Sequence, residues 1–199
     1  MKMNNQNNQL ILKEGFKPVV VVLLISIFLN IFISDTFGNI GFIITLALIF
    51  IYRNPSRTTV NNKGMILAPI DGKISAIDIS KNKYKIYINV NLCNTHVLRA
   101  PIKSKFKTKS LKNGLNLKST SYKARLLNTQ AVIKFDDIKV KLISGICNND
   151  IILYENEKVE ATQEVGVFLH GLVILELPRS CSINVNLNEK VYAGLTQIA

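Results

Sequence analysis

Two short motifs hold the side chains best suited to acid–base chemistry. Asp71 lies in LAPIDGKI (residues 67–74), where a proline and a glycine favour turns on either side of the carboxylate. His96 lies in LCNTHVLRAP (residues 92–101) and is one of only two histidines in the chain. An aspartate before glycine is usually a turn residue and a lone histidine is usually structural, so each gains a catalytic interpretation only through the other.

The three cysteines indicate neither metal nor disulfide chemistry. Cys93, Cys147 and Cys181 are odd in number, far apart in the chain and in no CxxC or metal-ligand spacing. We therefore expect reduced, cytoplasmic thiols and no metal site.

The domain that must position Asp71 and His96 is predicted to be mainly β. Apolar and polar side chains alternate over residues 84–92, which is the period of a half-buried strand. Residues 116–127 are the only part of this domain where a turn or two of helix is expected. The other expected strands are residues 131–135, 139–143, 151–154, 167–177 and 183–187.

An apolar region precedes this domain. Residues 19–33 and 37–52 carry no charge, and the connection between them holds one acidic residue, Asp35. Each stretch is roughly 22–24 Å long at 1.5 Å per residue, which favours two short spanning helices in a hairpin. A cleaved signal peptide is the alternative, but the second apolar stretch follows almost at once. The expected division is a mobile basic leader at 1–17, the membrane hairpin at 18–52 and the β domain at 53–199.

Positive charge lies on both sides of the hairpin and is absent from its turn, so both ends are expected in the cytoplasm. The flanking residues are Lys2, Lys13, Lys17, Arg53, Arg57 and Lys63. The whole chain has a formal charge of +12, with much of the excess between Lys103 and Arg125. Such a stripe suits an anionic partner, and the membrane hairpin favours anionic phospholipid over nucleic acid.

The order of the motifs resembles the short bacterial form of phosphatidylserine decarboxylase. An apolar hairpin is followed by YRNPSR (residues 52–57), LAPIDG, NTHVLRAP and the closing KVYAGLTQIA (residues 190–199). The resemblance implies a proenzyme that cleaves itself at a Gly-Ser bond and converts the serine into a pyruvoyl group. That group would bind the amine of phosphatidylserine and accept the electrons released with CO2, which gives phosphatidylethanolamine. In the family an Asp and a His of these two motifs are associated with both steps, and they correspond to Asp71 and His96.

The chain departs from the family at the cleavage motif. Where the family has FGS, this sequence has Gly171 followed by Leu172, and the alignment needs about one deleted residue there. Leucine has no hydroxyl, so a pyruvoyl group cannot form at Leu172 and the cofactor is expected to be absent. Ser180, Cys181 and Ser182 lie downstream as alternative nucleophiles, but none of them follows a glycine.

These features predict a compact, antiparallel, sandwich-like β domain with lipoyl-type hammerhead features, on the cytoplasmic face of a bacterial inner membrane. Three functions are compatible with it. The first is decarboxylation of phosphatidylserine in phosphatidylethanolamine synthesis. The second is a non-catalytic relative that binds anionic lipid, a second copy of the chain or a separate partner subunit. The third is a membrane-tethered carrier module, which would not require NTHVLRAP and which lacks a lysine at an obvious hairpin tip.

Overall fold

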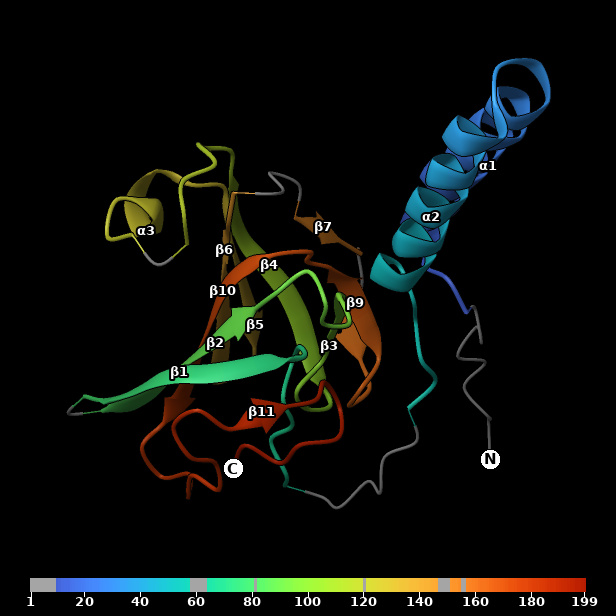
Figure 1. Cartoon of the computed structure of the whole chain (residues 1–199). Coiled ribbons are helices and arrows are strands. Elements are labelled where there is room, and N and C mark those ends of the chain that lie inside the picture. The colour runs from blue at the N-terminus through green and yellow to red at the C-terminus, as the bar shows by residue number, and fades with distance from the viewer. Residues whose placement is uncertain (1–9, 58–63, 81, 120, 147–150, 155–156) are drawn as a thin grey trace, which may run out of the picture. The chain divides into compact units, whose positions relative to one another are not determined.

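The computed structural model describes residues 10–57, 64–80, 82–119, 121–146, 151–154 and 157–199. The chain forms two compact units, one ending at Ser56 and one running from Arg57 to Ala199 (Figure 1). Most of the leader predicted at 1–17, and Cys147, lie outside the described residues.

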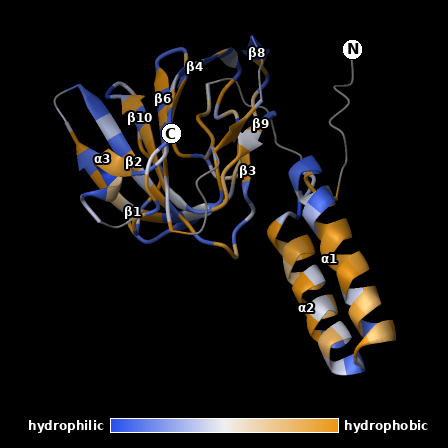
Figure 2. Cartoon of the chain, turned by 90° about the horizontal axis from the view of Figure 1, so that it is seen from above, coloured by the Kyte–Doolittle hydropathy of each residue, from blue (hydrophilic) through white to orange (hydrophobic). Residues whose placement is uncertain are grey.

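The first unit is a pair of antiparallel helices, α1 (Lys13–Phe32) and α2 (Asp35–Ile51). Small residues allow their backbones to approach closely, because a Cβ at Gly41 would collide with Ser26 and one at Gly38 would collide with Asn30. The outward faces of both helices are mostly apolar (Figure 2). By length and composition α1 is able to cross a membrane, while α2 is a shorter apolar helix of 17 residues.

Helix α1 begins earlier than predicted. Its first turns include Lys13 and Lys17, which lie within the leader predicted at 1–17. Lysine is nonetheless a good helix former. The backbone N–H of Leu12 donates to the carbonyl of Tyr52 over 2.9 Å, which ties the start of α1 to the end of α2.

The second unit is mainly antiparallel β structure, as predicted. An eight-stranded sheet has the order β11-β1-β2-β10-β6-β5-β4-β8, and a smaller sheet has the order β3-β9-β7. The elements of this unit are β1 (Gly72–Ile79), β2 (Lys83–Val90), β3 (Val97–Arg99), β4 (Ser104–Lys112), α3 (Ala124–Leu127), β5 (Gln130–Phe135), β6 (Ile138–Ser144), β7 (Ile152–Leu153), β8 (Lys158–Val159), β9 (Glu164–Val167), β10 (Gly171–Pro178) and β11 (Lys190–Val191).

The central strands β2 and β10 bury side chains on both faces. Ile88 and Val173 lie in the main core, which the small sheet also enters through Leu98. The opposite face holds a smaller cluster made by Tyr87, Ile143, Leu172 and Ile174. Alternate residues of β10 therefore belong to different cores.

Most of the predicted strands are confirmed, by β2, β5, β6 and β7, and α3 lies in the segment where helical turns were expected. The strand predicted over 167–177 is confirmed from Gly171 onward as β10, but its start is wrong, because β9 ends at Val167 and β10 begins only at Gly171. The strand predicted over 183–187 is also wrong. That segment is joined to the C-terminus by the hydrogen bond from Asn184 N to Ile198 O and belongs to neither sheet.

Candidate functional site

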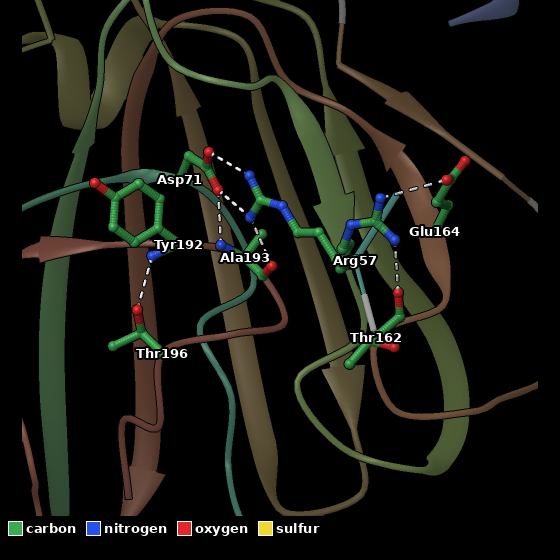
Figure 3. Close-up of polar contacts among 8 residues, drawn as sticks. Arg57, Asp71, Thr162, Glu164, Tyr192, Ala193 and Thr196 are labelled. Atoms are coloured by element: carbon green, nitrogen blue, oxygen red, sulfur yellow. Dashed lines mark hydrogen bonds and ion pairs between the residues drawn. The ribbon is translucent and has the colours of Figure 1, made fainter. Parts of the chain in front are cut away.

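Asp71 is held in a buried ion pair immediately before β1. Arg57 Nη1 donates to Asp71 Oδ1 over 2.6 Å and Arg57 Nη2 donates to Asp71 Oδ2 over 2.7 Å (Figure 3). The two side chains are 8% and 6% exposed. Two parallel N–H to oxygen bonds are the strong, planar geometry of guanidinium with carboxylate. Both oxygens of Asp71 are therefore engaged.

The C-terminal turn completes this arrangement. Ala193 N donates to Asp71 Oδ1 over 2.7 Å, and Arg57 Nη1 donates to the Ala193 carbonyl over 2.7 Å. The next residue, Gly194, has a φ of +70°, a conformation that favours glycine. The YRNPSR, LAPIDG and KVYAGLTQIA motifs therefore meet at one point, which their separation in the chain does not reveal.

A second buried arginine lies close to this ion pair. Arg99 of β3 is 1% exposed, and its Nη1 donates to the carbonyl of Thr162 over 3.1 Å. Its Nη2 lies 3.5 Å from Glu164 Oε1. Burial lowers the pKa of Arg99 from its ordinary value, and the carboxylate of Glu164 opposes that shift. Arg99 lies three residues after His96 in the NTHVLRAP motif, but nothing in the sequence indicates its partners.

His96 is fully buried in the turn before β3. Its Nε2 lies 3.2 Å from the carbonyl oxygen of Asn91, so this nitrogen carries the proton if the contact is a hydrogen bond. Its own carbonyl accepts from Phe168 N over 2.9 Å, which connects His96 to the segment just before Gly171.

The two candidate acid–base residues, Asp71 and His96, therefore have different hydrogen-bond partners. Asp71 bonds to Arg57 and Ala193, while His96 bonds to Asn91 and Phe168. The hydrogen bond from Phe168 N connects His96 to the segment that precedes Gly171. Their roles in catalysis remain predictions carried by the resemblance.

The Gly171–Leu172 bond lies in a continuous strand. Leu172 pairs with Asn89 of β2 on one side and with Ile143 of β6 on the other. Its side chain is 4% exposed and packs in the smaller cluster. Gly171 has a φ of +142°, and a Cβ there would collide with the carbonyl of Ile143. Glycine is therefore required at the first position of this strand.

The alternation of side chains along β10 indicates on which face of the strand a serine hydroxyl after Gly171 would lie. Leu172 faces the smaller cluster, whereas Val173 faces the main core, where Phe168 also lies. Gly171 shares the face of Val173, because successive residues of a strand alternate. If one residue is deleted after Gly171, as the resemblance implies, a residue restored there would occupy this core-facing position, which Gly171 itself holds in this chain. A one-residue deletion in a strand exchanges the two faces.

Two polar atoms beside Gly171 are buried and have no hydrogen-bond partner among the described residues. They are Ser144 Oγ, in the residue paired with Gly171 across the sheet, and His170 Nδ1 in the preceding residue. Burial lowers the pKa of His170 below its ordinary value of 6.5. Sequence analysis missed both residues, although the chain's two-histidine count was a signal for His170.

The alternative nucleophiles lie at the far end of β10. Ser180 is exposed and Cys181 is half-buried, in a turn where Cys181 N donates to the carbonyl of Pro178 over 3.2 Å. Strand β10, eight residues long, separates this turn from Gly171. The turn and the Gly171–Leu172 bond therefore lie at opposite ends of one strand.

These residues do not fit the pyruvoyl group that the resemblance implies. Such a group is made from a hydroxyl or thiol residue, and Leu172 supplies only a buried aliphatic side chain. We derive no reaction step through it. Within the described ranges, no group of three or more His, Cys, Asp and Glu side chains is placed to hold a metal ion.

Comparison with known proteins agrees with the ordered motifs. The sequence profile of the phosphatidylserine decarboxylase family matches residues 44–199. A putative archaetidylserine decarboxylase proenzyme of Methanosarcina mazei is 30% identical over 168 residues, covering 81% of this chain and 79% of that protein. A phosphatidylserine decarboxylase proenzyme of Wolbachia pipientis is 29% identical over 206 aligned residues, covering 94% and 89%.

A further phosphatidylserine decarboxylase proenzyme, from Geobacter metallireducens, is 26% identical and covers 98% of this chain and 97% of its own length. No solved structure matches the chain. The family profile covers the paired Arg57 and Asp71, His96 and the Gly171–Leu172 bond alike. The chain belongs to the phosphatidylserine decarboxylase family.

Proposed function

We propose that this chain is a membrane-anchored, phosphatidylserine decarboxylase-like protein of phospholipid biosynthesis that stays uncleaved and binds anionic phospholipid without decarboxylating it. The observation that carries this proposal is the position of Leu172, which is buried between β2 and β6 on the face opposite the main core. Leucine has no nucleophilic atom, and the Leu172 side chain lies on the face of β10 opposite the main core, so it cannot attack the preceding carbonyl.

The family membership supports phosphatidylserine as the lipid class. The fold keeps Asp71 and His96 buried, and it keeps Arg57 and Arg99 as buried cations beside Asp71. A site can retain binding groups after it has lost its electron sink, since binding and chemistry depend on different groups. The predicted lipid-binding role rests on this separation.

Helices α1 and α2 support the membrane anchor. At about 1.5 Å per residue, the 20 residues of α1 are roughly 30 Å long, which matches the hydrocarbon thickness of a bilayer. The hydroxyl of Ser26 donates to Val22 O and that of Thr45 donates to Gly41 O, so these buried polar groups are satisfied within the helices. Both helices would then span the inner membrane as a hairpin.

The positive charges flanking the hairpin support a cytoplasmic position for the β domain. Cys93 is exposed and provides a natural reporter of orientation. A membrane-impermeant maleimide should label it only after the cells are opened. Labelling in intact spheroplasts would contradict the cytoplasmic orientation, with Cys93→Ser as the control for reaction at the other cysteines.

A second candidate function is active conversion of phosphatidylserine to phosphatidylethanolamine and CO2. The ordered family motifs favour it, and it would require self-processing at Ser180 or Cys181 instead of Leu172. The turn that holds them lies at the other end of β10 from Gly171, and both lack a preceding glycine.

The test is reconstitution of the full chain in phosphatidylserine-containing nanodiscs. We expect no phosphatidylethanolamine, and we expect phosphatidylserine to be enriched among the lipids that stay with the protein after exchange into neutral detergent. Formation of phosphatidylethanolamine would support the second candidate. Retained lipid of the same composition as the bulk membrane would contradict lipid binding.

A further inference from the structure

An exposed apolar surface lies at the end of the sheet where β4, β5 and β6 meet α3. Tyr122 is 76% exposed, Leu126 66% and Leu115 55%. Monomeric domains rarely leave several large apolar side chains uncovered together, and such surfaces usually mark a contact with a membrane or a protein. We call this the α3 patch, and its apolar members are Leu111, Leu115, Tyr122, Leu126 and Leu127.

The α3 patch is held by a buried hydrogen-bonded frame. Asn128 is 2% exposed, and its Nδ2 donates to the carbonyls of Leu117 and Ser144, over 2.7 Å each. Asn128 Oδ1 accepts from Leu117 N over 2.9 Å, and Leu115 N donates to the carbonyl of Leu127 over 2.7 Å. Leu115 and Leu127 therefore lie side by side on a surface that these hydrogen bonds hold in place.

The charged side chains within the α3 patch are basic. Lys112, Lys118 and Lys123 are exposed there, and no acidic residue occurs in the sequence between Asp78 and Asp136. Asp78 and Glu176 lie to one side of it, around Tyr87, over which Arg125 stacks. Protein–protein interfaces are depleted in lysine relative to the rest of the protein surface. Exposed leucines and a tyrosine among lysines instead match the interface of an anionic bilayer, where aromatic rings sit at the headgroup level.

We propose that the α3 patch docks on the anionic surface of a lipid bilayer, with Tyr122 and Leu126 inserted among the headgroups and the neighbouring lysines bound to lipid phosphate or carboxylate. This inference rests on the proposed membrane anchor and specifies which face of the β domain meets the lipid. Only part of the basic stripe takes part, because Lys105 and Lys107 lie on the outer side of β4 before the patch begins.

The chain contains no tryptophan, so Tyr122→Trp creates a single fluorescent reporter in the full chain. In bilayers rich in an anionic lipid, we expect the introduced indole to show a blue-shifted emission that is quenched by brominated acyl chains. Both effects should diminish in neutral bilayers or at high salt. Tyr192→Trp is the matched control, since Tyr192 is 50% exposed and follows β11, which lies at the opposite end of the domain from α3 (Figure 1).

A pair of charge variants tests the lysines. In the Tyr122→Trp chain, Lys118→Gln with Lys123→Gln should make quenching of the indole equal in anionic and neutral bilayers. Lys73→Gln with Lys190→Gln removes the same charge from β1 and β11, and the stronger quenching in anionic bilayers should remain. An unquenched indole in a Tyr122→Trp chain that stays with the bilayer would overturn the docking proposal alone. Failure of the chain to enter bilayers would instead overturn the membrane anchor. Quenching of this indole only after an acidic protein is added would identify a protein site and contradict lipid docking.

Discussion

Replacing Leu172 with serine tests whether self-cleavage needs only a hydroxyl side chain or also needs that hydroxyl on the core-facing side of β10. If only the side chain were wrong, Leu172→Ser would restore self-cleavage. In the structure, however, the new hydroxyl would point into the smaller cluster, beside Ile143 and Ile174 and away from the face that carries Val173. We therefore expect Leu172→Ser to remain one intact chain.

The same substitution should be costly. Leu172 is 4% exposed, and truncating a buried leucine costs about 2–5 kcal/mol. An unpaired buried hydroxyl adds a further penalty, so we expect a loss of about 3–5 kcal/mol in the free energy of unfolding. The matched control is Leu187→Ser, because Leu187 is 58% exposed and its loss should change stability by less than about 0.5 kcal/mol.

Denaturant unfolding in mild detergent measures the stability, and gel electrophoresis measures cleavage. A second variant carries a serine inserted between Gly171 and Leu172, which keeps Leu172 and the rest of β10 in register. The serine then takes the core-facing position that Gly171 now holds, so the backbone before β10 must move to admit its Cβ beside the Ile143 carbonyl. If either variant is cleaved, the strand geometry requires it to be the insertion. Release of residues 172–199 from the Leu172→Ser variant, with the insertion variant intact, would refute the register argument.

Three further outcomes follow from the surroundings of Asp71, Gly171 and His170. Asp71→Asn should cost about 3–5 kcal/mol of stability, because it leaves Arg57 buried with a broken ion pair, whereas removing the exposed Lys103 beside Glu160 should cost less than about 1 kcal/mol. Gly171→Ala should destabilise the domain by more than about 1 kcal/mol, since its φ is +142° and its Cβ meets a carbonyl, and a wild-type denaturation midpoint would contradict this. The lowered pKa of His170 means that the unfolded chain binds its proton more readily, so stability should fall as pH drops through 6.5; a midpoint in His170→Asn with the same pH dependence as the wild type would contradict this.

Local patterning predicted much of the fold. Strand β2 was visible because one face is uniformly apolar, and the antiparallel class followed from several such segments. Strand β4 was not predicted, since its alternating lysines, such as Lys105 and Lys107, resembled a charge run as much as the outer face of a strand. The sequence does not separate β10 from β9. Both faces of β10 are buried, so its residues read as one continuous apolar run and do not alternate with polar ones.

The sequence predicts which residues belong to the candidate site better than it predicts the hydrogen bonds between them. Motif order identified Asp71 and His96, but nothing local indicates that Arg57 would occupy both oxygens of Asp71. Such a contact depends on how distant segments fold together. The leucine after Gly171 is plain in the sequence, whereas the face on which Leu172 lies depends on the register of β10 between β2 and β6.

The intact mass of the purified full chain, before and after incubation with a carbonyl-reactive hydrazine, distinguishes an uncleaved chain from a processed one. We expect one species of 22.3 kDa whose mass the hydrazine does not change, because Leu172 cannot yield a pyruvoyl group. Two fragments, with the C-terminal fragment gaining the mass of the hydrazine, would contradict it. The mass of that fragment would show whether Ser180, Cys181 or another residue had been converted.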